Sequence, residues 1–91
     1  MFIVVAYDIS DDHRRTRLHK ALKRFGTPVQ ESVFEFHLKL AELLRLKQFI
    51  HQAIDPQTDE VRFYYLCENC QQRTEATVSS RRSSDPYALI V

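Results

Sequence analysis

The sequence predicts an α+β fold in which two helices cover one face of an antiparallel sheet. An unbroken apolar run at residues 2–7 is typical of a buried strand. Segments 12–25 and 39–53 carry apolar residues at the spacing of amphipathic helices. Strand-like segments at 28–38 and 60–67 complete the order strand, helix, strand pair, helix, strand. This is the order of a ferredoxin-like βαββαβ sandwich.

Length and composition indicate one small globular domain. The chain has 91 residues, of which 44% are hydrophobic and 27% charged, values that exclude a disordered chain. No apolar run approaches the roughly 20 residues needed to span a bilayer. Met1 leads directly into the first strand without a signal-peptide pattern, so we expect a cytoplasmic protein with no membrane partner.

The first helix is expected to pack through one apolar stripe and to end at a glycine. Its stripe is Leu18, Ala21, Leu22 and Phe25. Gly26 follows directly and is the chain's one glycine, so we expect it to form a left-handed cap. Pro28 prevents the helix from continuing.

The middle of the chain predicts two strands and a second helix. The apolar alternation slips at residues 30–32, which indicates a bulge or sharp turn between two strands. We expect residues 55–59 to form a turn, residues 67–70 another turn, and residues 73–78 a short strand. The buried stripe expected on the second helix is Leu40, Leu43, Leu44, Ile50 and either Ala53 or Ile54.

The C-terminal residues predict a homodimer. We expect a ferredoxin-like domain over residues 1–78 and a linker with a C-terminal strand over residues 79–91. The apolar run 87–91 follows a polar segment and needs a sheet edge, which a second copy of the chain can supply. A sheet face left bare by the two helices would favour the same association.

Charge is concentrated on the first helix. The formal net charge is only +1, but between His13 and Gly26 there are six cations and no acid. The cations are Arg14, Arg15, Arg17, Lys20, Lys23 and Arg24. Such a surface fits nucleic-acid phosphates, and we expect Arg14, Arg15, Arg17 and Lys20 to contact phosphates and not bases. An ordinary solvated helix face is the alternative interpretation.

Asp8 ends the first strand beside this basic helix. A carboxylate at the rim of a sheet is a candidate metal ligand for phosphodiester chemistry. It is equally consistent with a helix cap, although Asp11 or Asp12 can fill that position. One carboxylate holds Mg²⁺ weakly. A two-fold axis beside Asp8 would bring a second carboxylate, so the expected dimer and the expected metal site support each other.

The remaining motifs are less specific. Cys67 and Cys70 form a C-x-x-C pair, for which structural thiols, a metal site shared between subunits and redox chemistry all remain open. A closed zinc site needs four ligands, and the histidines lack matching spacing. His13 and His19 are interpreted as surface residues, and Phe34 as core. Ser32 has no triad partner in the sequence.

An ordered set of segments resembles the CRISPR-associated Cas-two family. The matching segments are Tyr7-Asp8-Ile9-Ser10-Asp11-Asp12, Arg14-Arg15 with Arg17, Gly26, Val29-Gln30-x-Ser32-Val33-Phe34-Glu35 and Tyr64-x-Leu66-Cys67-x-x-Cys70. The resemblance implies a ferredoxin-like homodimer whose C-terminal strands join the partner's sheet. It also implies spacer acquisition in antiviral defence alongside the Cas-one integrase, and metal-dependent cleavage of RNA or DNA.

By position, the resemblance implies a set of site residues. Asp8 matches the family's metal-binding acid, for which the cofactor would be Mg²⁺. The matching nuclease-site residues are Tyr7, Arg15, Arg17 and Phe34, and Ser32 falls in the same motif. The chain departs from the pattern at Pro28, where some members have a basic residue, which implies weak cleavage. Two hypotheses follow: a magnesium-dependent endonuclease, or a non-catalytic scaffold that binds nucleic acid for the integrase.

Overall fold

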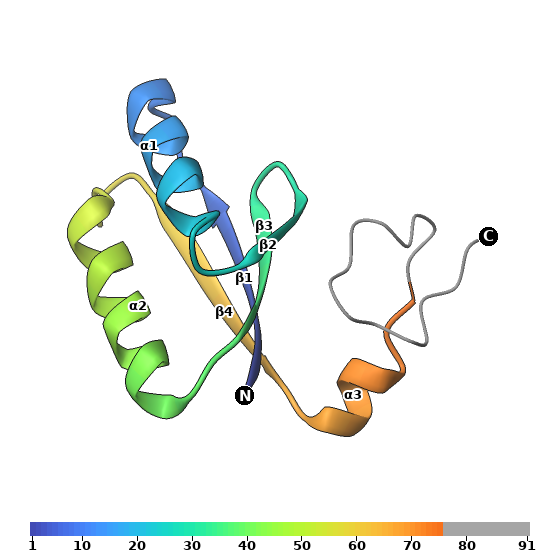
Figure 1. Cartoon of the computed structure of the whole chain (residues 1–91). Coiled ribbons are helices and arrows are strands. Elements are labelled where there is room, and N and C mark those ends of the chain that lie inside the picture. Colours follow the sequence, from blue (N-terminus) through green and yellow to red (C-terminus); the bar gives the residue numbers. More distant parts are fainter. Residues whose placement is uncertain (76–91) are drawn as a thin grey trace.

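A computed structural model describes residues 1–75 of the chain. Figure 1 shows the long helices on one side of the sheet and a short helix beyond the last strand. The elements are β1 (Phe2–Asp8), α1 (Asp12–Leu22), β2 (Thr27–Gln30), β3 (Val33–His37), α2 (Leu40–Ala53), β4 (Glu60–Leu66) and α3 (Glu68–Gln72). The expected order of strands and long helices is confirmed.

The sheet has the strand order β2-β3-β1-β4, and every pairing is antiparallel. This order places β1 and β3 at the centre, as two interleaved β-α-β units require. The predicted ferredoxin-like α+β fold is therefore confirmed. The slip predicted near residue 30 is also present, because the β2–β3 register shifts between Pro28 and Gln30 and the chain turns at residues 31–32.

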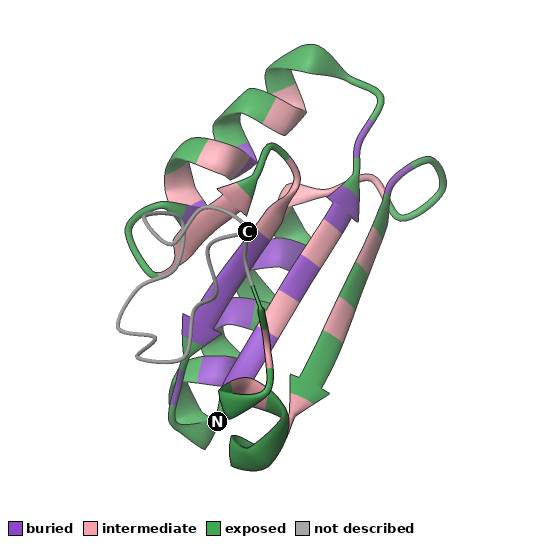
Figure 2. Cartoon of the chain, turned by 90° about the vertical axis from the view of Figure 1, so that its right-hand side faces the viewer, coloured by how far each residue is buried: buried purple, intermediate pink, exposed green. Residues whose placement is uncertain are grey.

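The core lies between the sheet and the two long helices. Buried and less buried residues alternate along β1, as Figure 2 shows, because successive side chains point to opposite faces. From β1 and β3, Ile3, Val5, Phe34 and Phe36 are almost fully buried. The helices contribute a set of leucines and one isoleucine: Leu18, Leu22, Leu43, Leu46 and Ile50.

The predicted helix stripes were partly wrong. Phe25, Leu40 and Leu44 are 60%, 62% and 57% exposed, whereas Leu46, which the prediction omitted, is buried. In α2, Leu43, Leu46 and Ile50 face the sheet at intervals of three and four residues. This face differs from the predicted one, so Leu40 and Leu44 lie on the outer side of the helix. The first helix also ends at Leu22, so Phe25 lies beyond it.

Gly26 serves a different purpose from the predicted left-handed cap. Its backbone is not in the left-handed region, and the residue at the C-cap position is Lys23 in a right-handed conformation. A Cβ at Gly26 would lie 2.5 Å from the Phe36 ring and 2.7 Å from the Glu35 carbonyl oxygen. The close approach of the chain to β3 requires a residue without a side chain here.

Gly26→Ala is expected to lower the free energy of unfolding by about 1 to 3 kcal/mol, because the Phe36 ring must leave its packed position. Urea unfolding followed by circular dichroism measures this change. Gln48→Ala, on an exposed position of α2, is the control and should change little. An unchanged midpoint for the glycine variant would contradict the packing account of this position.

The end of the described chain differs from the prediction in two respects. Residues 67–70, expected to be a turn, begin the short helix α3, with Cys67 at its N-cap. Residues 73–75 are not a strand, and the rest of the predicted strand at 73–78 lies outside the described residues. The linker and C-terminal strand predicted for 79–91 also lie outside them.

The second face of the sheet is not covered by α1 or α2. Val4 and Ala6 of β1 point to this face, and Tyr64 and Arg62 lie opposite them on β4. Tyr64 is 45% exposed. This surface leaves room for the sheet-to-sheet dimer expected from the sequence, which remains a prediction. Within residues 1–75, none of the helices has the length and apolar character that crossing a bilayer demands.

Candidate nucleic-acid groove and acidic strand end

Helix α1 starts at a cap that leaves Asp8 free for another role. The Asp11 carboxylate accepts a hydrogen bond of 2.8 Å from the Arg14 backbone N–H, the usual N-cap arrangement. Asp8, at the end of β1, is exposed and is not the cap of α1. The helix-cap interpretation of Asp8 is therefore wrong.

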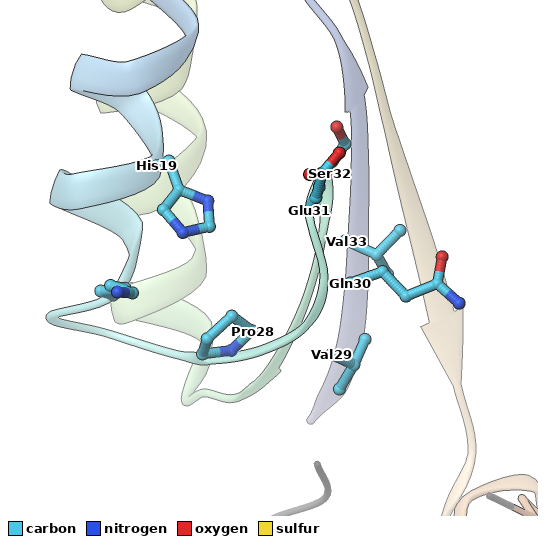
Figure 3. A pocket seen from close by; sticks show the side chains of 8 residues that line it. His19, Pro28, Val29, Gln30, Glu31, Ser32 and Val33 are labelled. Atoms are coloured by element: carbon cyan, nitrogen blue, oxygen red, sulfur yellow. The ribbon is translucent and has the colours of Figure 1, made fainter. Parts of the chain in front are cut away.

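A groove runs between α1 and the β2–β3 hairpin (Figure 3). It consists of two adjoining hollows of about 670 and 460 Å³ that share His19, Lys23, Glu31 and Ser32. Figure 3 shows His19 projecting from α1 toward the hairpin. The other lining residues are Tyr7, Arg15, Thr16, Lys20, Pro28, Val29, Gln30 and Val33. We call this surface the α1–hairpin groove.

Tyr7 lies at the base of the groove and contacts both elements that border it, α1 and the β2–β3 hairpin. Its hydroxyl donates to the Glu31 carbonyl oxygen at 3.1 Å and lies 3.1 Å from Nδ1 of His19. Its backbone N–H donates to the Ser32 carbonyl oxygen at 3.0 Å. Burial raises the pKa of Tyr7, and the nearby Arg15 opposes this shift only in part. The side chain therefore stays a neutral hydrogen-bond donor in the physiological range.

His19 is held in a defined orientation. A phenol has one proton, so when Tyr7 donates it to Glu31, the contact with His19 requires Nδ1 to be the donor. Nε2 of the neutral ring then carries a lone pair. The ring also packs edge-on against Phe34, with centroids 5.1 Å apart. Phe34 has no exposed surface and packs beneath both Tyr7 and His19, so it supports the groove from the core.

Most basic residues of α1 lie on one of two surfaces. Arg15, His19 and Lys23 follow one another at four-residue intervals and line the groove. Arg17 instead borders a separate hollow with Asp12 and His13. Lys20 borders both surfaces. Arg15 donates to the Ile9 carbonyl oxygen at 3.0 Å and pairs with Asp12, which orients its guanidinium beside Tyr7.

Arg14 is held within the chain. Its guanidinium makes two hydrogen bonds to the Asp59 carboxylate, of 2.7 and 3.1 Å. The Asp59 side chain has no exposed surface and also accepts from the Asp55 backbone N–H. This pair fastens the start of α1 to the loop before β4. Arg14 was expected to contact phosphates, but its donors toward Asp59 are already used, so the groove depends on other cations.

The Arg14–Asp59 pair makes the free energy of unfolding depend on pH in the acidic range. The hydrogen bonds from Arg14 hold the pKa of Asp59 below its ordinary value of 3.8. A folded-state pKa below the unfolded one means that the stabilisation is present above pH 3.8 and is lost as pH falls through the folded-state value. Asp59→Asn should lower the melting temperature at pH 7 by several degrees. It should also make the decrease of the melting temperature with falling pH less steep than in wild type.

Thermal unfolding between pH 2 and 7 tests this expectation, since the range extends on both sides of 3.8. Asp12→Asn removes an exposed pair within α1 and is the control, with little change expected. An acid dependence that is equally steep in wild type and Asp59→Asn would show that other carboxylates govern it.

Asp8 lies apart from the groove within one chain. Side chains alternate along β1, so Tyr7 faces the helices while Asp8 faces the other side of the sheet. Glu60 of β4 is the register partner of Asp8, and it forms an ion pair of 3.4 Å with Arg62. The structure brings Tyr7, Arg15, Lys20 and Ser32 together but places Asp8 and Arg17 elsewhere.

The acidic strand end, formed by Asp8 of β1 and Glu60 of β4, suits a cation that takes few ligands from the protein. Within residues 1–75 no three histidine, cysteine or acidic side chains are grouped as metal ligands. Asp8 and Glu60 are register partners, so both acids lie at this end of the sheet. Proteins commonly bind Mg²⁺ through one or two carboxylates, with water completing the coordination. The residues present therefore fit Mg²⁺ better than a metal that needs a full protein cage.

Comparison with known proteins decides the family. The family model described as CRISPR-associated protein Cas2 matches residues 1–74. The chain belongs to the Cas2 family. A relative from Chloroflexus aurantiacus, named CRISPR-associated endoribonuclease Cas2 3, is 42% identical over 91 residues, covering 100% of this chain and 98% of the relative. A Thermus thermophilus protein named CRISPR-associated endoribonuclease Cas2 is 38% identical over 74 residues, covering 81% and 79%.

Solved structures of Cas2 proteins share the fold. Cas2 of Streptococcus pyogenes, determined at pH 6.5, has a TM-score of 0.75 at 36% identity and covers 84% of this chain and 98% of its own. A chain of a partial Cas6-RT-Cas1–Cas2 complex has a TM-score of 0.67 at 29% identity, covering 80% and 86%. The predicted family membership is confirmed, and the endoribonuclease names of the relatives support nuclease activity.

Three residues of the candidate sites in this Cas2 family member were not predicted as site residues: His19, Lys23 and Glu60. His19 was interpreted as an ordinary surface residue, yet it lines the groove between Tyr7 and the hairpin. The spacing of Arg15, His19 and Lys23 at i, i+4 and i+8 was the available signal for a shared helix face. Glu60 had no such signal, because only the β1–β4 register places it opposite Asp8.

Proposed function

We propose that this Cas2 family member is a cytoplasmic, magnesium-dependent endonuclease that acts in the spacer-acquisition step of CRISPR defence and cleaves RNA in preference to DNA. The observation that carries the proposal is the α1–hairpin groove, which places Arg15, His19, Lys20 and Lys23 along one hollow. The endoribonuclease names of its relatives support RNA as the substrate.

The groove cations provide sequence-independent contacts. Within residues 1–75 the side chains of Lys20 and Lys23 make no hydrogen bond or ion pair, so both ammonium groups can meet phosphate oxygens. Arg15, oriented by Ile9 and Asp12, adds a guanidinium beside Tyr7. Pro28, at the position where some family members have a basic residue, lies on the hairpin wall with Lys23 lining the same hollow. Lys23 can therefore supply the charge that Pro28 lacks.

Magnesium would be held at the acidic strand end. Asp8, with Glu60 beside it, would be its ligand, and Asp8 of a second copy in the homodimer would complete the protein contribution. When bound, a magnesium ion polarises a phosphoryl oxygen and lowers the pKa of a coordinated water. Because Asp8 lies apart from the groove within one chain, the groove offers a separate route, in which the lone pair of His19 Nε2 can accept a proton from an attacking hydroxyl while Tyr7 keeps the ring oriented.

A scaffold role is the second candidate function. The observation that favours it is the likeness to a chain of a solved complex that contains Cas1 and Cas2. In this role the homodimer would bind nucleic acid along α1 and dock the Cas1 integrase without cutting. Arg17 and Lys20, on the outer surface of α1, would then contact phosphates together with the groove.

Cleavage assays separate the two functions. Purified full-length protein is incubated with labelled single-stranded RNA, single-stranded DNA and duplex DNA, in Mg²⁺ and in a chelator. The proposal expects RNA fragments in Mg²⁺ alone, with slower cleavage of DNA. Binding of all three substrates without fragments at any Mg²⁺ concentration would overturn the nuclease proposal and support the scaffold.

A further inference from the structure

The C-x-x-C pair lies away from both surfaces described above. β4 runs from Glu60, opposite Asp8, to Leu66, opposite Phe2, so Cys67 and Cys70 lie beyond the other end of the strand. The sequence left structural, metal and redox roles open for this pair. The geometry allows a choice among them.

Both cysteines are free and exposed, and their sulfur atoms are 3.3 Å apart. The Cys70 backbone N–H points to Cys67 Sγ at 3.4 Å, which stabilises negative charge on that sulfur. Hydrogen bonding with the backbone N–H and then the side chain of Cys70 lowers the pKa of Cys67, and the neighbouring Cys67 raises the pKa of Cys70. One sulfur is therefore suited to attack, and the other to follow as the resolving thiol.

A structural or metal role fits the surroundings less well. Exposed thiols bury no apolar surface and do not contribute to the core. Within residues 1–75, no third histidine, cysteine or carboxylate joins the pair as a metal ligand, although a structural zinc needs four. Thiol–disulfide exchange needs only the two sulfurs already in place.

We propose that Cys67 and Cys70 form a thiol–disulfide exchange site whose substrate is a low-molecular-weight disulfide. The Cys67 thiolate attacks one sulfur of the substrate, forming a mixed disulfide and releasing the first thiolate. Cys70 then loses its proton and attacks Cys67 Sγ, which forms the Cys67–Cys70 disulfide and releases the second thiolate. The two released thiolates take up the two cysteine protons, so the cysteine pair is oxidised and the substrate disulfide is reduced.

Reaction with a disulfide, in wild type and in single-cysteine variants, tests the roles assigned to Cys67 and Cys70. Full-length protein is treated with oxidised glutathione, quenched with an alkylating reagent and measured by intact mass. Wild type should lose two hydrogens, resist alkylation, remain free of intermolecular disulfides and return to the dithiol with a reducing agent. Cys70→Ser should accumulate the glutathione adduct on Cys67. Cys67→Ser should react at least about tenfold more slowly, because its remaining thiol has the higher pKa.

Three outcomes would overturn the proposal. They are equal reaction rates of the two single variants, a disulfide formed only between chains, and tightly bound zinc that protects both thiols in wild type. The measurement follows the sulfur atoms and not cleavage, so it is independent of the proposed nuclease function.

Discussion

Asp8→Asn is expected to lower Mg²⁺-dependent RNA cleavage by at least about a hundredfold, the usual effect of removing one electrostatic stabiliser of a transition state. The substitution keeps the size of the side chain and removes the charge that would hold the metal. Because Asp8 is exposed and does not cap α1, the fold should not change. Initial rates under single-turnover conditions, with melting temperature measured in parallel, test the expectation.

Glu68→Gln is the matched control, since it neutralises an exposed acid beyond the opposite end of β4. It should cleave as wild type does. His19→Asn locates the chemistry independently. If Asp8→Asn retained full activity while His19→Asn lost about a hundredfold or more, cleavage would proceed by acid–base chemistry in the groove, and Asp8 would have no part in it.

Lys20→Ala with Lys23→Ala is expected to weaken RNA binding by on the order of tenfold or more. The slope of log K against log salt should also become shallower, by about 0.7 for each phosphate that the protein no longer neutralises. Both ammonium groups border the α1–hairpin groove. Fluorescence anisotropy across a range of salt concentrations, in a chelator to prevent cleavage, measures affinity and slope together.

Arg24→Ala with Arg45→Ala provides the control for this pair. It removes the same charge from a different hollow, which is also lined by Phe25 and Phe49. Its salt slope should match wild type. If both double variants weakened binding equally, affinity would depend on net charge alone, and the groove would have no special place in recognition.

The strand and helix order could be predicted because each signal was local. The apolar run ending at Asp8 and the slip near residue 30 both follow from backbone periodicity, and both are present in the structure. The stripe of α2 was harder to predict, because Leu40, Leu43, Leu44 and Leu46 allow more than one helical face. Only packing against the sheet selects among them.

The candidate site could be predicted only in part, because some of its residues depend on contacts between distant parts of the chain. A concentration of cations is visible in the sequence, but which of them pair within the fold is not: Arg14 meets Asp59 across 45 residues. The role of Gly26 also depended on a distant partner, the Phe36 ring, and not on its own backbone. Residues whose function comes from a single long-range contact leave no periodic pattern in the chain.

Photo-crosslinking tests the central claim, that RNA lies in the α1–hairpin groove. Wild-type protein is bound in a chelator to a single-stranded RNA that carries photoreactive uridines, irradiated and mapped by mass spectrometry. The account predicts adducts at Tyr7, Lys20, Lys23 and Ser32, which line the groove. Adducts confined to the surface of Arg45 and Phe49, with none in the groove, would contradict it.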